Sequence, residues 1–247
     1  MELKFKGKTA LVTGAVGAIG KGLITVFAEN GADLLLLDIN EEKLIEAKAM
    51  AESFGVRAEI IVCDISNETD VAREIEKGEK LFGKIDFLVN NAAVYQCWSP
   101  FLDVPMSEWK KFFDVNVFGT VNVTRAVLPG MLERGYGKIV NVASVAGYYG
   151  NANMSHYSAT KGAIIAWSSA LAKELAGKGI TVNCVSPGTV SSVYDGDIDS
   201  YHQMDLCRLG RTGTGRENAE LIAFLCTEGA NYIIGQNILI DGCRSSI

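Results

Sequence analysis

Features that mark membrane, secreted or metal-binding proteins are scarce in this sequence. Its 247 residues include four prolines and two histidines, and its six cysteines form neither a Cys-x-x-Cys nor a Cys/His ligand pattern. We therefore expect no metal site, and reduced thiols in a reducing compartment, which points to the cytoplasm. Residues 1–8 lack the hydrophobic stretch of a secretory signal, and no apolar run approaches the roughly 20 residues that span a bilayer.

An excess of basic residues is also missing. The chain carries 23 Lys and Arg against 29 Asp and Glu, a formal net charge of −6. An acidic surface repels phosphate backbones and anionic lipids, so we expect no nucleic-acid and no membrane partner. With 48% hydrophobic residues, the chain has enough apolar material for one large core and too little length for two comfortable domains. It is expected to form a single domain over residues 1–247.

What the sequence does contain is an alternation of short apolar runs and longer amphipathic stretches. Runs that are apolar on both faces are typical of parallel strands covered by helices on either side. The predicted strands are Thr9–Val12, Leu34–Leu37, Glu59–Val62, Phe87–Val89, Lys138–Val142, Thr181–Val185 and Asn237–Ile240. Helical patterns begin near Ala18, Glu41, Glu68, Ser107, Ser155 and Arg216. This order predicts an α/β fold, a three-layer, doubly wound Rossmann fold with a seven-stranded parallel sheet and ligands at the carboxyl ends of its strands.

One stretch, residues 189–210, follows neither the helical nor the strand pattern. Its many polar residues would make a poor strand. An irregular segment of this length is more often a lid or binding loop than an inert connection. We interpret it as the lid over a substrate site.

A glycine-rich turn follows the first predicted strand and opens the first helix. Gly14, Gly17 and Gly20 permit a tight turn in which backbone N–H groups approach a pyrophosphate at the helix amino terminus. The second strand ends about 20 residues later at Asp38, whose carboxylate can bind the ribose hydroxyls of an adenosine and would repel a 2′-phosphate. The cofactor predicted from this pairing is NAD rather than NADP. The alternative is that Asp38 merely caps the following helix.

Polar residues also follow the third and fourth strands. Asp64 and Ile65 come after the third strand, and Asn90 closes the fourth. Because the carboxyl ends of parallel strands meet at one edge of the sheet, these residues are expected to bracket the adenosine half of the same ligand.

The reactive residues are expected at the start of the helix that begins near Ser155. Tyr157 and Lys161 stand four residues apart and therefore share one helix face. A neighbouring ammonium favours the phenolate over the phenol, which brings a tyrosine toward acid/base behaviour near neutral pH. Ser144 directly follows the fifth strand and so lies at the same edge of the sheet.

Together these features resemble the short-chain dehydrogenase/reductase family. The similarity rests on the glycine turn, Asn90-Asn91-Ala92, Asn116, Ser144, Tyr157-Ser158-Ala159-Thr160-Lys161 and Pro187-Gly188, and it spans nearly the whole chain. It implies that Tyr157 is the general acid/base, that Lys161 lowers its pKa and holds the nicotinamide ribose, and that Ser144 orients the substrate oxygen. It further implies that Asn116 holds a water that relays the proton to solvent.

The same resemblance assigns further cofactor contacts. It implies that Ile19 and Gly20 lie at the pyrophosphate, and that Pro187, Gly188, Val190 and Ser192 lie around the nicotinamide end. The sequence departs from the family pattern where Ala18 replaces a glycine of the turn and where Ala93 replaces the glycine after Asn-Asn-Ala. Each alanine adds a methyl group near backbone that should approach the cofactor, so we expect weaker cofactor binding than is typical.

The substrate pocket is expected to be aromatic and mostly uncharged. Its predicted lining residues are Gln96, Trp98, Tyr149 and Met154. This wall favours a neutral, sterol-like or polyol-like alcohol over a phosphorylated or carboxylated one. For His156, contact with backbone near the helix amino terminus is preferred to a role in the pocket, and Tyr148 and Tyr149 could equally pack at a subunit interface.

Three functional classes fit these observations. The first is an NAD-dependent dehydrogenase that interconverts a secondary alcohol and a ketone. The second is a 3-oxoacyl-thioester reductase, which Asp38 and the acidic charge balance disfavour, and the third is a non-catalytic NAD-binding redox sensor, which the four filled catalytic positions disfavour. The resemblance also implies a homotetramer, for which small residues on the helices beginning near Ser107 and Ser155 allow close packing.

Overall fold

The computed structural model describes residues 4–95, 98–191 and 207–244. In these residues a seven-stranded sheet has the order β3-β2-β1-β4-β5-β6-β7, and every neighbouring pair is parallel. The strands are β1 (Thr9–Thr13), β2 (Asp33–Asp38), β3 (Ala58–Val62), β4 (Phe87–Asn90), β5 (Gly137–Val142), β6 (Ile180–Pro187) and β7 (Asn237–Ile240). The predicted doubly wound Rossmann fold is confirmed, with strand ends that agree to within three residues.

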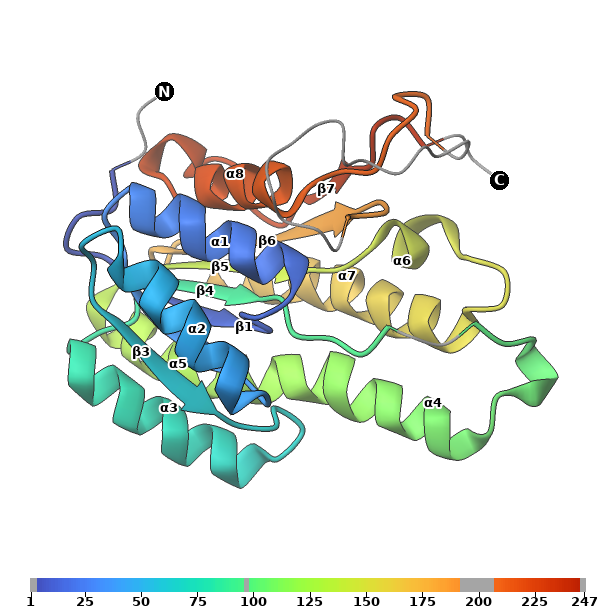
Figure 1. Ribbon diagram of the computed structural model, residues 1–247, viewed down its shortest axis with the longest axis horizontal. Helices are drawn as coiled ribbons and strands as arrows, with labels where there is room; N and C mark the ends of the chain where they lie inside the picture. The colour runs from blue at the N-terminus through green and yellow to red at the C-terminus, as the bar shows by residue number, and fades with distance from the viewer. Residues whose placement is uncertain (1–3, 96–97, 192–206, 245–247) are drawn as a thin grey trace.

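Helices cover both faces of the sheet and make three layers (Figure 1). The longer ones are α1 (Ala18–Glu29), α2 (Glu41–Glu52), α3 (Glu68–Phe82), α4 (Met106–Phe113), α5 (Thr120–Arg134), α7 (Ser155–Leu175) and α8 (Gly215–Leu225). Apolar side chains of α1, α2 and α8 pack in one core cluster, and those of α3, α5 and α7 pack in a second cluster on the other face. In Figure 1, α1 runs in front of the sheet beside α8.

The side chains of strand β2 show that the sheet is buried on both faces. Its leucines alternate, with Leu34 and Leu36 in the cluster of α1 and Leu35 and Leu37 in the cluster of α3. All four are essentially inaccessible to solvent. Burying one leucine side chain stabilises the fold by roughly 1.5–3 kcal/mol, so a continuous apolar run is stable only between two helical layers.

Strands β1 and β4 mark the point where the order of strands in the sheet reverses. Strands β2 and β3 lie on one side of β1, whereas β4 to β7 follow on the other. Crossovers on the two sides of this point leave from opposite faces of the sheet, which opens a crevice at the carboxyl ends of β1 and β4. The residues that end these strands, Thr13 and Asn90, therefore border the crevice in which a ligand is expected.

Four short elements were not expected from the sequence. Helices α4 and α5 are joined without a loop by η2 (Asp114–Gly119), a π-helical turn that contains Asn116. A short helix, α6 (Val145–Tyr149), follows β5 and begins directly after Ser144, and the chain also forms two 3-10 turns, η1 (Phe101–Asp103) and η4 (Glu228–Ala230). π-turns inside helices occur frequently at functional sites, which draws attention to Asn116.

Among the described residues, no helix is both long and apolar enough to cross a membrane.

Candidate active site

The glycine turn after β1 is held in a conformation that larger residues could not adopt. Gly14 has φ +64°, and a Cβ there would lie 2.7 Å from the Cα of Ala92. A Cβ on Gly20 would lie 2.4 Å from the carbonyl oxygens of both Gly14 and Ala15. Gly14 is therefore needed for the close approach of the loop after β4 to the turn, and Gly20 for the close approach of helix α1.

Space for an anion remains above this turn. Gly17 is exposed and is the N-cap of α1, and a Cβ there would meet only the Gly14 carbonyl oxygen at 3.6 Å among the described atoms. Helix α1 is described throughout, and it has no side-chain cap and no acidic residue in its first turn. Its first N–H groups and the positive end of its dipole are therefore available to a phosphate. The glycine turn and the amino terminus of α1 fit a pyrophosphate, and the contacts of Gly14, Gly17, Ile19 and Gly20 with it stay predictions.

Replacing Gly20 with alanine tests this packing. The added methyl group clashes with two backbone carbonyl oxygens, which should destabilise the protein by about 1–3 kcal/mol and lower Tm by several degrees. Gly17→Ala is the matched control, because its methyl group meets ordinary contact distance and its φ of −74° suits alanine. Thermal unfolding without added cofactor measures both, and equal Tm values for the two variants would contradict the assignment.

Two residues clamp the glycine turn, and sequence reasoning had not given them this role. The Asn91 side chain donates to the carbonyl oxygens of Thr13 (3.1 Å) and Gly14 (2.9 Å). The Thr13 hydroxyl accepts from the N–H groups of Asn91 and Ala92, both at 3.0 Å. The Asn-Asn-Ala motif was visible in the sequence, but its contact with a turn 77 residues earlier depends on the pairing of β1 with β4.

Asp38 lies at the end of β2 next to this turn. Its carboxylate accepts from the N–H groups of Ile39 (2.8 Å), Asn40 (3.2 Å) and Val16 (3.4 Å). The alternative that Asp38 caps α2 is wrong, because the side chain of Asn40 does so by accepting from Lys43 N. The Asp38 carboxylate therefore lies beside the glycine turn, and helix α2 does not require it as a cap.

The residues predicted for the adenosine half differ in accessibility. Asp64 is exposed, and its Oδ1 accepts from the backbone N–H and hydroxyl of Ser66. The side chain of Ile65 is buried against η2. The Asn90 side chain is also buried and donates to Thr124 and Asn141. Any contact of Asn90 or Ile65 with a ligand would therefore use mainly backbone atoms.

Lys161 is the most perturbed ionisable group at this edge of the sheet. Its side chain is buried, and Nζ donates to the carbonyl oxygen of Val142 at 2.8 Å. Burial lowers the pKa of Lys161 to about 8, and the nearby Cys184 acts weakly in the opposite direction. Nζ lies 5.8 Å from the centroid of the Tyr157 ring. The predicted pairing of these two side chains on one face of α7 is thus present in the structure.

Ser144 precedes α6 and Asn116 lies in η2, two elements that pack against α7. Ser144 is partly buried and caps α6, where its Oγ accepts from Ala146 N at 3.1 Å. Asn116 is buried in η2, accepts from Val94 N at 2.8 Å and donates to Val94 O at 3.0 Å and to the Thr160 hydroxyl at 3.2 Å. The Thr160 hydroxyl itself donates to the carbonyl oxygen of Tyr157 at 2.8 Å. Asn116 therefore connects the loop after β4 to the first turn of α7, with Thr160 as an intermediate that sequence reasoning had not singled out.

The end of β6 and the residues that follow it form the part of the site where the nicotinamide is predicted to lie. Pro187 ends this strand, Gly188 N donates to Ile240 O at 3.0 Å, and Val190 pairs with Gly213. Ser192 lies outside the described residues, as do residues 192–206 of the predicted lid. A cavity of about 220 Å³ lies beside the end of β6, lined in part by Gly188, Thr189 and Asp241.

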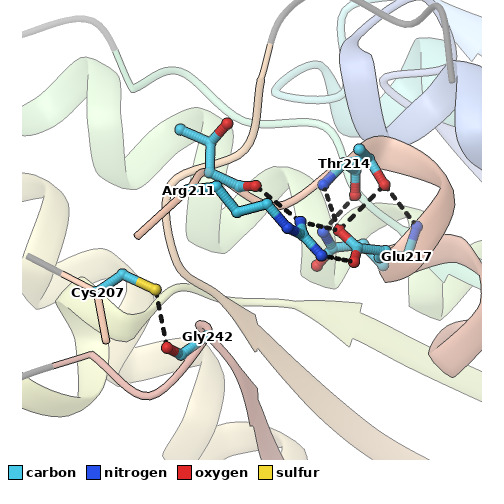
Figure 2. A network of polar contacts seen from close by, with 7 residues as sticks. Cys207, Arg211, Thr214, Glu217 and Gly242 are labelled. Carbon is cyan, nitrogen blue, oxygen red and sulfur yellow. Dashed lines mark hydrogen bonds and ion pairs between the residues drawn. The ribbon is translucent and has the colours of Figure 1, made fainter. Parts of the chain in front are cut away.

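Polar contacts hold the described part of the chain that follows residue 206 (Figure 2). Figure 2 shows the Arg211 guanidinium facing Glu217, with contacts of 2.7 and 3.1 Å. Glu217 also closes a capping box with Thr214 at the start of α8, and the arginine lowers the pKa of its carboxyl. The Cys207 thiol donates to Gly242 O at 2.8 Å. These contacts attach Cys207 to the turn after β7, and Arg211 and Thr214 to the start of α8.

The predicted substrate-pocket residues are partly brought together. Trp98 (69%) and Tyr149 (41%) are exposed, and Met154 is partly buried. The loops of Trp98 and Met154 are joined by a hydrogen bond from Ser99 N to Asn153 O at 2.9 Å. Gln96 lies outside the described residues.

The expectation that His156 contacts backbone is wrong. This side chain is completely buried, and within the described residues neither ring nitrogen has a hydrogen-bond partner. It does not line the pocket either.

In the part of the chain that the structure describes, no group of three His, Cys, Asp or Glu side chains is arranged to hold a metal ion.

Comparison with known proteins agrees with this geometry. A family model described as short chain dehydrogenase matches residues 8–202. A 3-oxoacyl-(acyl-carrier-protein) reductase of Thermotoga maritima is 36% identical, covering 97% of this chain and 98% of that protein. A diacetyl reductase of Staphylococcus epidermidis is 34% identical, covering 95% and 97%. The solved structure of NAD+-bound xylitol dehydrogenase superimposes with a TM-score of 0.89 at 36% identity, covering 96% of this chain and 98% of that one.

The match therefore includes the glycine turn, the Tyr157 and Lys161 pair and the sheet that brings them to one edge. Its length and identity, together with the same fold in a solved relative, exclude a chance likeness of motifs. This chain belongs to the short-chain dehydrogenase family of oxidoreductases.

Proposed function

We propose that this chain is an NAD(H)-dependent oxidoreductase that interconverts a secondary alcohol and a ketone by hydride transfer. Asn116, Ser144, Tyr157 and Lys161 are the proposed catalytic residues. The observation that carries the proposal is the buried Lys161 ammonium 5.8 Å from the Tyr157 ring, at the edge of the sheet where the glycine turn also lies. Burial of the Lys161 ammonium costs free energy even with its hydrogen bond to Val142 O, so stability alone does not account for a lysine at this position.

The residues at this edge would hold the cofactor along the carboxyl ends of the strands. Gly14, Gly17, Ile19 and Gly20 would bind the pyrophosphate, and Asp38 and the Asp64–Ile65 turn the adenosine half. Asn90 would contribute backbone, and Pro187, Gly188, Val190 and Ser192 would surround the nicotinamide. When bound, the nicotinamide accepts or supplies the hydride.

The protein residues would manage the proton and the geometry. Tyr157 would donate its phenolic proton to a ketone oxygen, or accept the proton of an alcohol in the reverse direction. The Lys161 ammonium would stabilise the phenolate, and Ser144 would orient the substrate oxygen. Asn116 would keep the Tyr157 turn aligned with the loop at Val94 through Thr160. The water relay that the family resemblance implies for Asn116 stays a prediction.

The preference for NAD depends on Asp38 in this proposal. Asp38→Asn removes the charge that would repel a 2′-phosphate, and should lower the ratio of kcat/KM for NAD over NADP about tenfold or more. Asp33→Asn, at the other end of β2, is the control and should leave the ratio unchanged. Initial rates with both cofactors measure it, and an unchanged ratio in Asp38→Asn would show that another group selects the cofactor.

The substrate is proposed to be neutral. The exposed aromatic residues Trp98 and Tyr149 support this, as do relatives named for diacetyl and xylitol. A second candidate is reduction of a 3-oxoacyl thioester, which the 36% identity to the Thermotoga maritima reductase favours. Each substrate class must therefore be represented in the test.

The test is a panel of initial rates. Polyols, diacetyl, sterols, simple cyclic alcohols and a 3-oxoacyl thioester are each assayed with both cofactors, beside NADH binding by fluorescence. NAD-dependent turnover of a neutral alcohol or ketone supports the proposal, whereas turnover of the thioester alone supports the second candidate. NADH binding without any turnover would favour a non-catalytic sensor.

We also propose that the chain is a single domain that acts as a cytoplasmic homotetramer. Small residues on α7, including Gly162, Ala163 and Ala166, support close helix packing between subunits. Sedimentation equilibrium measures the assembly, and a monomer at micromolar concentration would contradict it.

A further inference from the structure

The imidazole of His156, directly before the proposed general acid/base, is an ionisable group without a hydrogen-bond partner among the described residues. It has no solvent-accessible surface, and neither Nδ1 nor Nε2 has a hydrogen-bond partner in residues 4–95, 98–191 and 207–244. Its neighbours are the ring of Phe112, edge-on at 4.6 Å between centroids, and the ring of Trp109 at 5.8 Å. An aromatic enclosure of this kind accommodates a neutral imidazole and disfavours an imidazolium ion.

Charged groups near His156 do not compensate for this enclosure. Burial lowers the pKa of His156 below its ordinary value, and the Glu108 carboxylate opposes this only in part. Glu108 lies 3.9 Å from Lys111, and Lys110 pairs with Asp114 at 2.6 Å. The ionisable groups on the elements packed against this end of α7 are Glu108, Lys110 and Lys111 on α4, Asp114 on η2, Tyr148 and Tyr149 on α6, Cys184 on β6, and Tyr157 and Lys161 on α7 itself.

The same enclosure contacts Tyr157. The Phe112 ring stands edge-on to the Tyr157 ring as well, with centroids 6.4 Å apart and planes at 90°. Phe112 is buried and so cannot turn away into solvent. Because Phe112 packs against both rings, any displacement of the His156 ring must also disturb the packing that orients the Tyr157 ring.

We propose that His156 is a positioning residue: its neutral imidazole fixes the first turn of α7 through Phe112, and its protonation in acid releases that turn and stops turnover. The effect has a defined sign. The unfolded chain binds a proton at His156 near pH 6.5, whereas the folded chain resists it to lower pH. The stability contributed by neutral His156 is therefore complete above about pH 6.5 and is lost progressively as the pH falls below it.

Direct observation of the imidazole requires no substrate. The chain has two histidines, His156 and His202, so protein labelled with 13C at histidine Cε1 gives two resonances, which His202→Asn assigns. Because burial lowers the pKa of His156, we expect the midpoint of its resonance in the folded protein to lie below pH 6.5. A midpoint near 6.5 in the folded protein would overturn the proposal.

Stability against pH gives the second measurement. In His156→Leu, which keeps an apolar side chain and cannot titrate, the fall in Tm between pH 7.5 and 5.5 should be smaller than in wild type by up to about 5 °C. His202→Asn should retain the wild-type difference. If His156→Leu does not fold, His156→Met replaces it, because its flexible side chain adapts to irregular space. A wild-type difference in the apolar variant would refute the role of His156.

The link to catalysis rests on the proposed function and is tested separately. Ketone reduction is the direction to use, because Tyr157 then gives up a proton and acid does not disfavour it. Wild-type kcat should fall in acid with the same midpoint as the His156 resonance, and His156→Leu should lack this fall. A fall in kcat that is the same in His156→Leu as in wild type would overturn the positioning role. If no ketone in the panel is reduced, the proposed function fails while the resonance and Tm measurements still decide the state of His156.

Discussion

Tyr157→Phe should lower kcat by about 10²–10⁴-fold while leaving NADH binding nearly unchanged. The phenolic hydroxyl is the proton donor and acceptor in the proposed reaction, and general acid/base catalysis contributes an effect of this size. The phenylalanine ring can keep the edge-on contact with Phe112, so the fold around it should persist. Steady-state kinetics with the best substrate of the panel, together with NADH fluorescence titration, measure the two quantities.

The control for this variant is Tyr148→Phe. Tyr148 is exposed on α6, where its ring packs edge-on against Tyr149 at 4.9 Å. Loss of its hydroxyl should leave kcat within about twofold of wild type, as is usual for surface substitutions. Near-normal turnover in Tyr157→Phe would contradict the role of Tyr157 as the general acid/base.

Lys161→Met should abolish turnover and at the same time stabilise the protein. Burial lowers the pKa of Lys161 from its ordinary 10.5 to about 8, so holding the ammonium in the folded state costs about 3 kcal/mol at pH 7. The variant loses the hydrogen bond to Val142 O, which is worth about 1 kcal/mol. We expect a net gain of roughly 2 kcal/mol, or several degrees in Tm, together with a kcat lowered at least about 10²-fold.

The pH dependence of that gain provides an internal check. Wild-type stability should rise between pH 8 and 10.5, since the folded chain releases the Lys161 proton there before the unfolded chain does. The advantage of Lys161→Met should therefore be full below pH 8 and shrink above it. Lys138→Met is the matched control: this lysine is also buried, with its pKa lowered by burial, but it lies at the start of β5, away from the site. It should leave kcat unchanged, and a loss of turnover there equal to that in Lys161→Met would contradict a specific role for Lys161.

The sequence predicted the fold well because its signals are local. The alternating leucines of β2, the glycine turn before α1 and the spacing of Tyr157 and Lys161 depend on strand and helix periods that neighbouring residues set by themselves. The same reasoning could not identify the cap of α2. Asp38 and Asn40 are both good N-cap residues, and only the backbone path after β2 decides that Asn40 takes this position.

In the candidate site too, the sequence indicated individual residues, whereas their contacts depended on the tertiary structure. Sequence reasoning named Asn116 and Tyr157 but not their connection through the Thr160 hydroxyl, because a π-helical turn shifts Asn116 relative to an ordinary helix. It also expected His156 to contact backbone, as polar residues near helix amino termini usually do. The packing of α4 against α7 instead encloses the imidazole between Phe112 and Trp109.

By itself, then, the sequence determined the order of strands and helices, the family and the residues available for chemistry, since each follows from periodicity or from motifs within a few residues. Tertiary structure alone decided which polar groups have partners: Asn91 binds the glycine turn, the buried Lys161 ammonium binds Val142 O, and among the described residues the His156 imidazole has no hydrogen-bond partner. The physical reason is that hydrogen bonds and desolvation act over a few ångströms in space. Their partners here come from strands and helices that are distant in the chain and meet only when the sheet is assembled.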